Sequence, residues 1–212
     1  FIEFPTLLDD EFDEFFNDHM QWSINKFLPR VSTVMEPFKD FRLVLNHRGI
    51  GDVVTAFSKP EIRKSIQRLW EIDDFYQEYR KKLAVANKEL SELGFPTMIA
   101  GRAVVPFDKY SDTYRGMELS FEDALEDEEI VLKFCEKFQE KQICQLRNGN
   151  PDGAKNGKQV VMALHKGSDD MMSNALYEKF YWKHLKEIIE VCQEAHMMTN
   201  VFCDGVYTDK LK

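Results

Sequence analysis

The last third of the sequence contains two apolar segments that each end on polar residues and enclose one amphipathic segment. The first segment, residues 160–164, is followed by His165, and the second, residues 200–203, is followed by Asp204. Between them, residues 172–189 repeat apolar side chains at helical spacing. This order predicts a β-α-β unit with parallel strands and a right-handed crossover. Parallel α/β folds keep their chemistry at the carboxyl ends of strands, so the polar residues there are candidates for function.

Further helices and one more strand are predicted upstream. Residues 60–93 give the clearest helix, with Ser58 as its cap and Gly94 as its stop. Residues 98–105 predict a buried strand, and residues 120–143 predict a helix that opens in the style of a capping box. Helices and strands therefore alternate, which is typical of a parallel α/β fold.

The length of 212 residues suits one domain. We expect a helical N-terminal part over residues 1–95 and β/α units over residues 96–212. An eight-stranded barrel needs more strands than the three predicted, so a barrel of this length would be incomplete and would leave unpaired sheet edges. The chain begins at Phe1 rather than Met. We therefore expect that its start was removed or that it is part of a longer protein.

Composition excludes several classes of partner. The net charge of −9 argues against nucleic acid, whose binding depends on basic patches. No apolar run approaches the length of a membrane span, so we expect no membrane partner. The four cysteines form no C-x-x-C pair, which favours reduced thiols and a cytoplasmic location.

Several short motifs resemble those of one known family. They are Pro106-Phe-Asp with Arg115-Gly, Leu164-His-Lys-Gly, Met172-Ser173, Phe180-Tyr-Trp-Lys, and Phe202-Cys-Asp-Gly with Tyr207 and Leu211. Together they resemble the uroporphyrinogen decarboxylase superfamily, which includes the tetrapyrrole decarboxylase and methyltransferases that act with corrinoid proteins. The resemblance implies the (β/α)8 TIM-barrel fold, of which this chain would be the central part of a divergent member.

The resemblance also implies a reaction. The leading interpretation is decarboxylation of tetrapyrrole acetate side chains in porphyrin and heme biosynthesis, which needs an acid–base group, cationic contacts to carboxylates and no cofactor. The alternative is transfer of a methyl group from a small methylated substrate to a corrinoid protein, which needs a metal ion or an acid. Methyltransferase members carry His-x-Cys where this chain has Phe202 and Asp204, so no zinc site is predicted there. A third interpretation is a non-catalytic, truncated barrel that self-associates, for example as a homodimer, through open sheet edges.

The candidate catalytic residues follow the three predicted strands. We expect Asp108 to hydrogen-bond pyrrole N–H groups or to orient a substrate, His165 to act as a general acid–base or a metal ligand, and Asp204 to take a proton or hold a hard metal. The candidate substrate-binding residues are Tyr110, Tyr114, Arg115, Lys166 and Tyr207. Each has a structural alternative, such as a loop ion pair, a solvated lysine or a turn aspartate.

Overall fold

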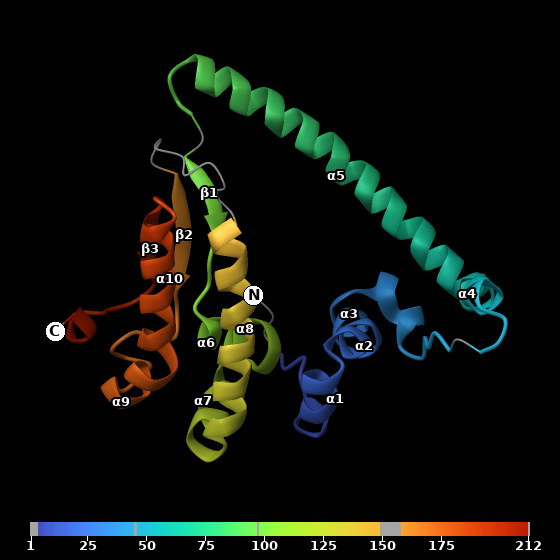
Figure 1. Ribbon diagram of the computed structural model, residues 1–212, viewed down its shortest axis with the longest axis horizontal. Coiled ribbons are helices and arrows are strands. Elements are labelled where there is room, and N and C mark those ends of the chain that lie inside the picture. The colour runs from blue at the N-terminus through green and yellow to red at the C-terminus, as the bar shows by residue number, and fades with distance from the viewer. Residues whose placement is uncertain (1–3, 45, 97, 149–157, 212) are drawn as a thin grey trace. The chain divides into compact units, whose positions relative to one another are not determined.

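The structure is a computed structural model that describes residues 4–44, 46–96, 98–148 and 158–211 (Figure 1). The chain divides into two compact units. An N-terminal unit contains residues 6–97, and a C-terminal unit contains residues 98–212 together with residues 1–5. No described helix combines the length and the apolar character that crossing a bilayer requires.

The N-terminal unit is helical. Its elements are a 3₁₀ turn Asp9–Glu11, α1 Phe12–Asn17, α2 His19–Trp22, a π-helical turn Ser23–Phe27, α3 Leu28–Val31, a 3₁₀ helix Thr33–Phe38, α4 Ile50–Phe57 and α5 Pro60–Glu92. The buried carboxylate of Glu11 binds the Arg30 guanidinium through two bonds of 2.6 and 2.7 Å and accepts a third from the Trp22 indole. Burial opposes ionisation of Glu11, but these donors outweigh it and lower its pKa to about 2. This ion pair joins the first helices to α3.

The long helix predicted over residues 60–93 is confirmed as α5, but its first residue is not capped as predicted. Lys59 rather than Ser58 occupies the N-cap position, and no side chain accepts a hydrogen bond there. Only the beginning of its apolar stripe is covered, where Ile62 and Ile66 pack against Phe38 and Phe41. Beyond that point the stripe is exposed.

The C-terminal unit is an α/β layer. Its strands are β1 Ile99–Arg102, β2 Gln159–Leu164 and β3 Met198–Cys203, in the order β1-β2-β3 with both pairings parallel. Its helical segments are α6 Pro106–Lys109, a π-helical turn Tyr110–Arg115, α7 Met117–Glu126, α8 Glu128–Asn148, α9 Asn174–Leu176, a π-helical turn Tyr177–Trp182, α10 Lys183–Glu194 and a 3₁₀ turn Asp209–Leu211. The predicted parallel α/β arrangement is therefore confirmed for these three strands.

Two local predictions in this unit have different outcomes. Ser173 caps α9 as expected, with its hydroxyl accepting from the Leu176 N–H. The capping box predicted at Ser120 is wrong, because α7 begins at Met117 after Gly116, and Ser120 is buried inside the helix. Asp127 then separates α7 from α8, so the single helix predicted there is two.

The two faces of the sheet differ in burial. Val160, Met162 and Leu164 of β2 are buried, and the alternate residues are only partly so. Helices α8 and α10 run beside the strands (Figure 1), and the Gln139 side-chain amide of α8 donates to the His184 carbonyl of α10 at 3.0 Å. On the opposite face Phe202, which pairs with Ala163, is 63% exposed.

Candidate functional site

Asp108 links the ends of two strands. It lies in α6, just after β1, and is fully buried. Its carboxylate accepts the backbone N–H of His165 at 3.0 Å and that of Lys166 at 2.8 Å, both directly after β2. The Tyr181 hydroxyl donates a third bond of 2.6 Å to the same group. Burial raises the pKa of Asp108, and these three donors oppose the shift. Because both of its carboxylate oxygens accept these hydrogen bonds, Asp108 holds the loop after β2 in position.

A second carboxylate holds the side chains of the same loop. Asp112 Oδ2 lies 2.6 Å from His165 Nδ1, and Asp112 Oδ1 lies 2.7 Å from Lys166 Nζ. A carboxylate only accepts, so Nδ1 carries the proton and donates it, which leaves Nε2 as the basic nitrogen of the neutral ring. All three side chains are mostly buried with a small exposed part. This arrangement orients an imidazole and places a cation beside it.

Asp112 was not among the residues predicted from sequence. It lies four positions after Asp108, within the π-helical turn Tyr110–Arg115. Asp108 accepts from the backbone of His165 and Lys166, whereas Asp112 binds their side chains. The spacing of four residues on one helical face is the signal that could have found it.

Two of the predicted substrate-binding residues bind another protein group. The Tyr110 hydroxyl donates to Asp123 at 2.6 Å, and the Arg115 guanidinium donates to the same carboxylate at 2.7 and 2.8 Å. Both side chains are buried. In this structure the cluster fastens the π-helical turn to α7, which matches the structural alternative of a loop ion pair.

The remaining predicted residues are Tyr114, Tyr207 and Asp204. They lie apart from the group formed by Asp108, Asp112, His165 and Lys166, or at its border. Tyr114 packs edge-on against Phe134 with Lys109 over its ring, and burial raises the Tyr114 pKa. The Tyr207 hydroxyl is buried beside Tyr181 and has no hydrogen-bond partner within the described part of the chain, and burial raises its pKa as well. Asp204 is exposed after β3, where its backbone N–H donates to the Leu164 carbonyl at 3.0 Å. The backbone at the exit of β3 therefore adjoins the exit of β2.

Gly167 allows the close packing behind this site. A Cβ atom at this position would lie 2.7 to 2.9 Å from three atoms of the Tyr181 ring. Such distances are too short for carbon atoms in contact, whose optimum is about 3.5–4.0 Å. The glycine thus lets the tyrosine approach close enough to reach Asp108.

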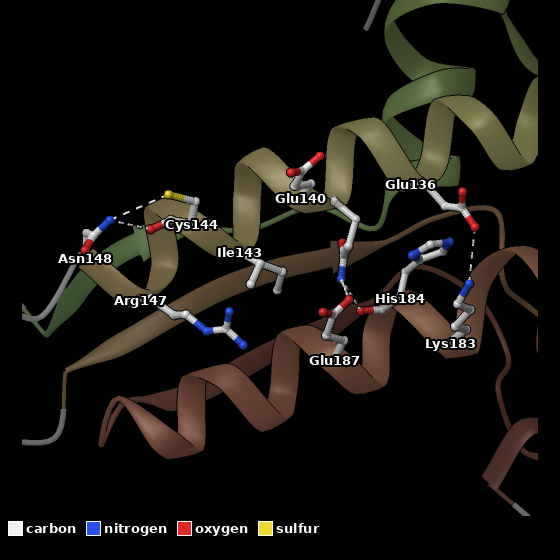
Figure 2. Close-up of a pocket in the computed structure, with 10 residues that line it drawn as sticks. Glu136, Glu140, Ile143, Cys144, Arg147, Asn148, Lys183, His184 and Glu187 are labelled. Carbon is white, nitrogen blue, oxygen red and sulfur yellow. Dashed lines mark hydrogen bonds and ion pairs between the residues drawn. The ribbon is translucent and has the colours of Figure 1, made fainter.

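A separate cavity of about 500 Å³ lies between α8 and α10 and contains none of the predicted site residues (Figure 2). Glu136 of α8 faces Lys183 of α10 at 3.5 Å, and the His184 ring lies between the two helices. His184 is 2% exposed, and neither ring nitrogen has a hydrogen-bond partner among the described residues. Burial lowers its pKa to about 4, so the ring is neutral at neutral pH.

The donor groups do not gather into a metal centre in the described part of the chain. There, no three side chains of His, Cys, Asp or Glu are arranged to hold an ion together. Cys203 and Asp204 both lie exposed at the end of β3, and Phe202 occupies the neighbouring position.

Comparison with known proteins found no match: neither a family model, nor a curated protein, nor a solved structure is similar to this chain.

Proposed function

We propose that this chain is part of a uroporphyrinogen decarboxylase-like enzyme in which His165 transfers protons. The observation that carries the proposal is the 2.6 Å bond between His165 Nδ1 and Asp112 at the carboxyl end of β2. Strand ends of this kind hold the catalytic groups of parallel α/β enzymes. The motif resemblance supplies the substrate class, a tetrapyrrole with acetate side chains.

The residues around His165 suit proton transfer. Asp108 fixes the backbone of residues 165 and 166, and Asp112 fixes the imidazole, so that Nε2 presents its lone pair in one direction. Decarboxylation of a pyrrole acetate needs a proton on the ring before carbon dioxide leaves, a proton on the methylene carbon afterwards, and loss of the ring proton to restore the pyrrole, so that one proton is taken up overall. An oriented imidazole is suited to these steps, because it can both accept and donate a proton.

Lys166 supplies positive charge beside the imidazole. Its ammonium group lies 2.7 Å from Asp112 and is mostly buried. A substrate carboxylate that approaches this group would share it with Asp112, and its attraction would be strengthened by the low exposure of the site. Lys166 therefore binds an acidic substrate in this proposal, and no cofactor takes part.

The test is an assay of carboxylate loss from uroporphyrinogen with the full natural protein. Substitution of His165 by Gln removes the imidazole while keeping a polar side chain. We expect it to lower kcat by about 10²- to 10⁴-fold, the usual contribution of a positioned acid–base group. His47 is exposed and outside the site, so His47→Gln is the matched control and should retain full activity. An unchanged rate in His165→Gln would refute the role of His165.

One observation favours methyl transfer to a corrinoid protein as the second candidate. Histidines that bind metals usually donate their other ring N–H to a carboxylate, as His165 does to Asp112. His165 Nε2 would then be a ligand of the metal that activates the methyl donor. A stoichiometric metal in the purified protein that is lost in His165→Gln, together with methylation of a corrinoid protein, would favour this candidate over decarboxylation.

A further inference from the structure

Helix α5 presents a long apolar stripe that is exposed. Tyr76, Tyr79, Leu83 and Leu90 of α5, together with its C-cap Leu93, are between 44% and 73% exposed. Stripes of this kind on a soluble helix normally face a packing partner, since their amphipathic pattern stabilises the helix only when it is covered. The covered part of α5 ends near Ile66, where the small core of the N-terminal unit stops.

The stripe follows the heptad spacing of a coiled coil. From position 76 onward the apolar residues recur at alternating steps of three and four, at 76, 79, 83, 86, 90 and 93. An average step of about 3.5 residues keeps the stripe on one side of a supercoiled helix and is the mark of helix–helix pairing. Positions 76, 83 and 90 then correspond to a, and positions 79, 86 and 93 to d.

We infer that this stripe pairs with the same stripe of a second copy of the chain, in antiparallel orientation. In an antiparallel pair each a residue lies opposite a d residue. The register that matches every apolar position sets Tyr76 against Leu93, Tyr79 against Leu90, and Leu83 against Ala86 of the second copy. All six layers of the seam then contain an apolar residue from each copy. In the two layers that contain the small Ala86, the larger Leu83 of the other copy lies opposite it.

Packing distinguishes this orientation from a parallel pair. In parallel pairing every residue lies opposite itself, so that Ala86 would face Ala86 and leave a gap in the seam. The antiparallel register places the large Leu83 opposite the small Ala86 in two symmetric layers. The paired segment, residues 76–93, is roughly 27 Å long at 1.5 Å per residue.

The charges beside the seam favour the same orientation. Lys82 and Glu89 occupy g positions, which face each other between antiparallel helices. The chosen register places Lys82 of each copy opposite Glu89 of the other, which forms two symmetric ion pairs. In a parallel pair Lys82 would lie opposite the uncharged Asn87. In the structure Lys82 lies 2.8 Å from Glu78 of its own helix, an exposed pair that contributes little and can be exchanged.

The first test is the oligomeric state of the full chain by sedimentation equilibrium. We expect the unmodified chain to be a dimer at concentrations of about 10–100 µM, in line with a short seam. Leu83→Glu places a charge in the centre of the seam and should shift the chain to monomer. Val85→Glu is the matched control, because Val85 is 58% exposed on the same helix at heptad position c, outside the a and d seam, and this variant should remain a dimer.

Circular dichroism of both variants verifies that the helix content is retained. A monomeric unmodified chain over this range would overturn the inference. So would a dimer that persists in Leu83→Glu, because the copies would then associate through another surface, such as the sheet edges.

The second test is a charge exchange that reports orientation. Lys82→Glu alone turns both ion pairs across the antiparallel seam into pairs of like negative charge. This change should weaken dimerisation by about tenfold. Glu89→Lys alone should do the same with basic pairs. The double variant restores opposite charges and should regain the original dissociation constant. A double variant that binds no more tightly than the single variants would overturn the antiparallel orientation.

Discussion

The hydroxyl of Tyr181 donates a 2.6 Å hydrogen bond to the carboxylate of Asp108, 73 positions earlier in the chain. Both side chains are fully buried. The bond joins the segment after β1 to the π-helical turn before α10, and the same carboxylate holds the loop after β2. The candidate site thus depends on one buried acceptor and its donors.

Replacing Asp108 by Asn should destabilise the protein more than replacing Tyr181 by Phe. The amide of Asn can accept the loop N–H groups with only one oxygen, and its NH₂ group would face donors. We expect a loss of about 2–4 kcal/mol for Asp108→Asn and about 1–2 kcal/mol for Tyr181→Phe, measured by urea unfolding. Equal losses would mean that the tyrosine bond, rather than the loop, is the main contribution of Asp108.

Gly167→Ala should lower stability by forcing Tyr181 away from Asp108. The added methyl group would meet the ring at 2.7 to 2.9 Å. We expect a loss of about 1–3 kcal/mol in urea unfolding, as for other overpacked sites. Gly101→Ala is the control, since a Cβ there meets nothing within 4 Å. If the clash is the cause, Gly167→Ala should cost much less in a Tyr181→Leu background, and equal costs in the two backgrounds would contradict it.

Asp112→Asn should reduce activity by misorienting His165 rather than by removing a reacting group. An amide can present NH₂ to Nδ1 and favour the wrong tautomer. If the chain transfers protons as proposed, kcat should fall by about 10–100-fold, and the pH–rate profile should change with it. The double variant with His165→Gln should be no slower than His165→Gln alone, because the two residues act as a unit. Additive losses would argue that Asp112 acts independently.

The buried His184 should make the protein less stable in mild acid. Its pKa is about 4 in the folded protein and near 6.5 when unfolded. Between these values the unfolded chain binds more protons, so stability is complete above about pH 6.5 and falls as the pH drops toward 4. We expect His184 alone to account for a loss of about 2 kcal/mol at pH 5.

The comparison that isolates this effect is His184→Leu, whose unfolding free energy should depend less on pH between 5 and 7.5. The exposed His47, changed to Gln, serves as the control and should leave the pH dependence as it is. The same slope in His184→Leu and in the unmodified chain would show that other groups cause the acid sensitivity.

Periodicity and strand exits predicted much of the C-terminal unit. The parallel direction of β1, β2 and β3, the cap at Ser173 and the position of His165 at a strand exit all follow from local patterns. These features depend on spacing of two or 3.6 residues and on side chains close in sequence, which a single sequence displays.

Other features depend on contacts that are distant in sequence. The four-residue spacing places Asp112 on the same helical face as Asp108, but it does not show that Asp112 contacts a loop more than 50 positions later. Likewise, the apolar spacing of α5 predicts an amphipathic helix, but it does not show that most of the apolar stripe is exposed within a single copy of the chain. The barrel stays a prediction, because three strands establish an α/β sheet and no more.

The burial of Asp108 has a kinetic consequence for the loop after β2. The amide protons of His165 and Lys166 are hydrogen-bonded to the Asp108 carboxylate, which is fully buried and not in contact with water. They can exchange with solvent hydrogen only when Asp108 becomes exposed, which also breaks its bond to Tyr181. The loop that carries the proposed catalytic histidine therefore opens together with α6 and the turn Tyr177–Trp182, as one cooperative unit, although it has the length and position of an ordinary surface loop.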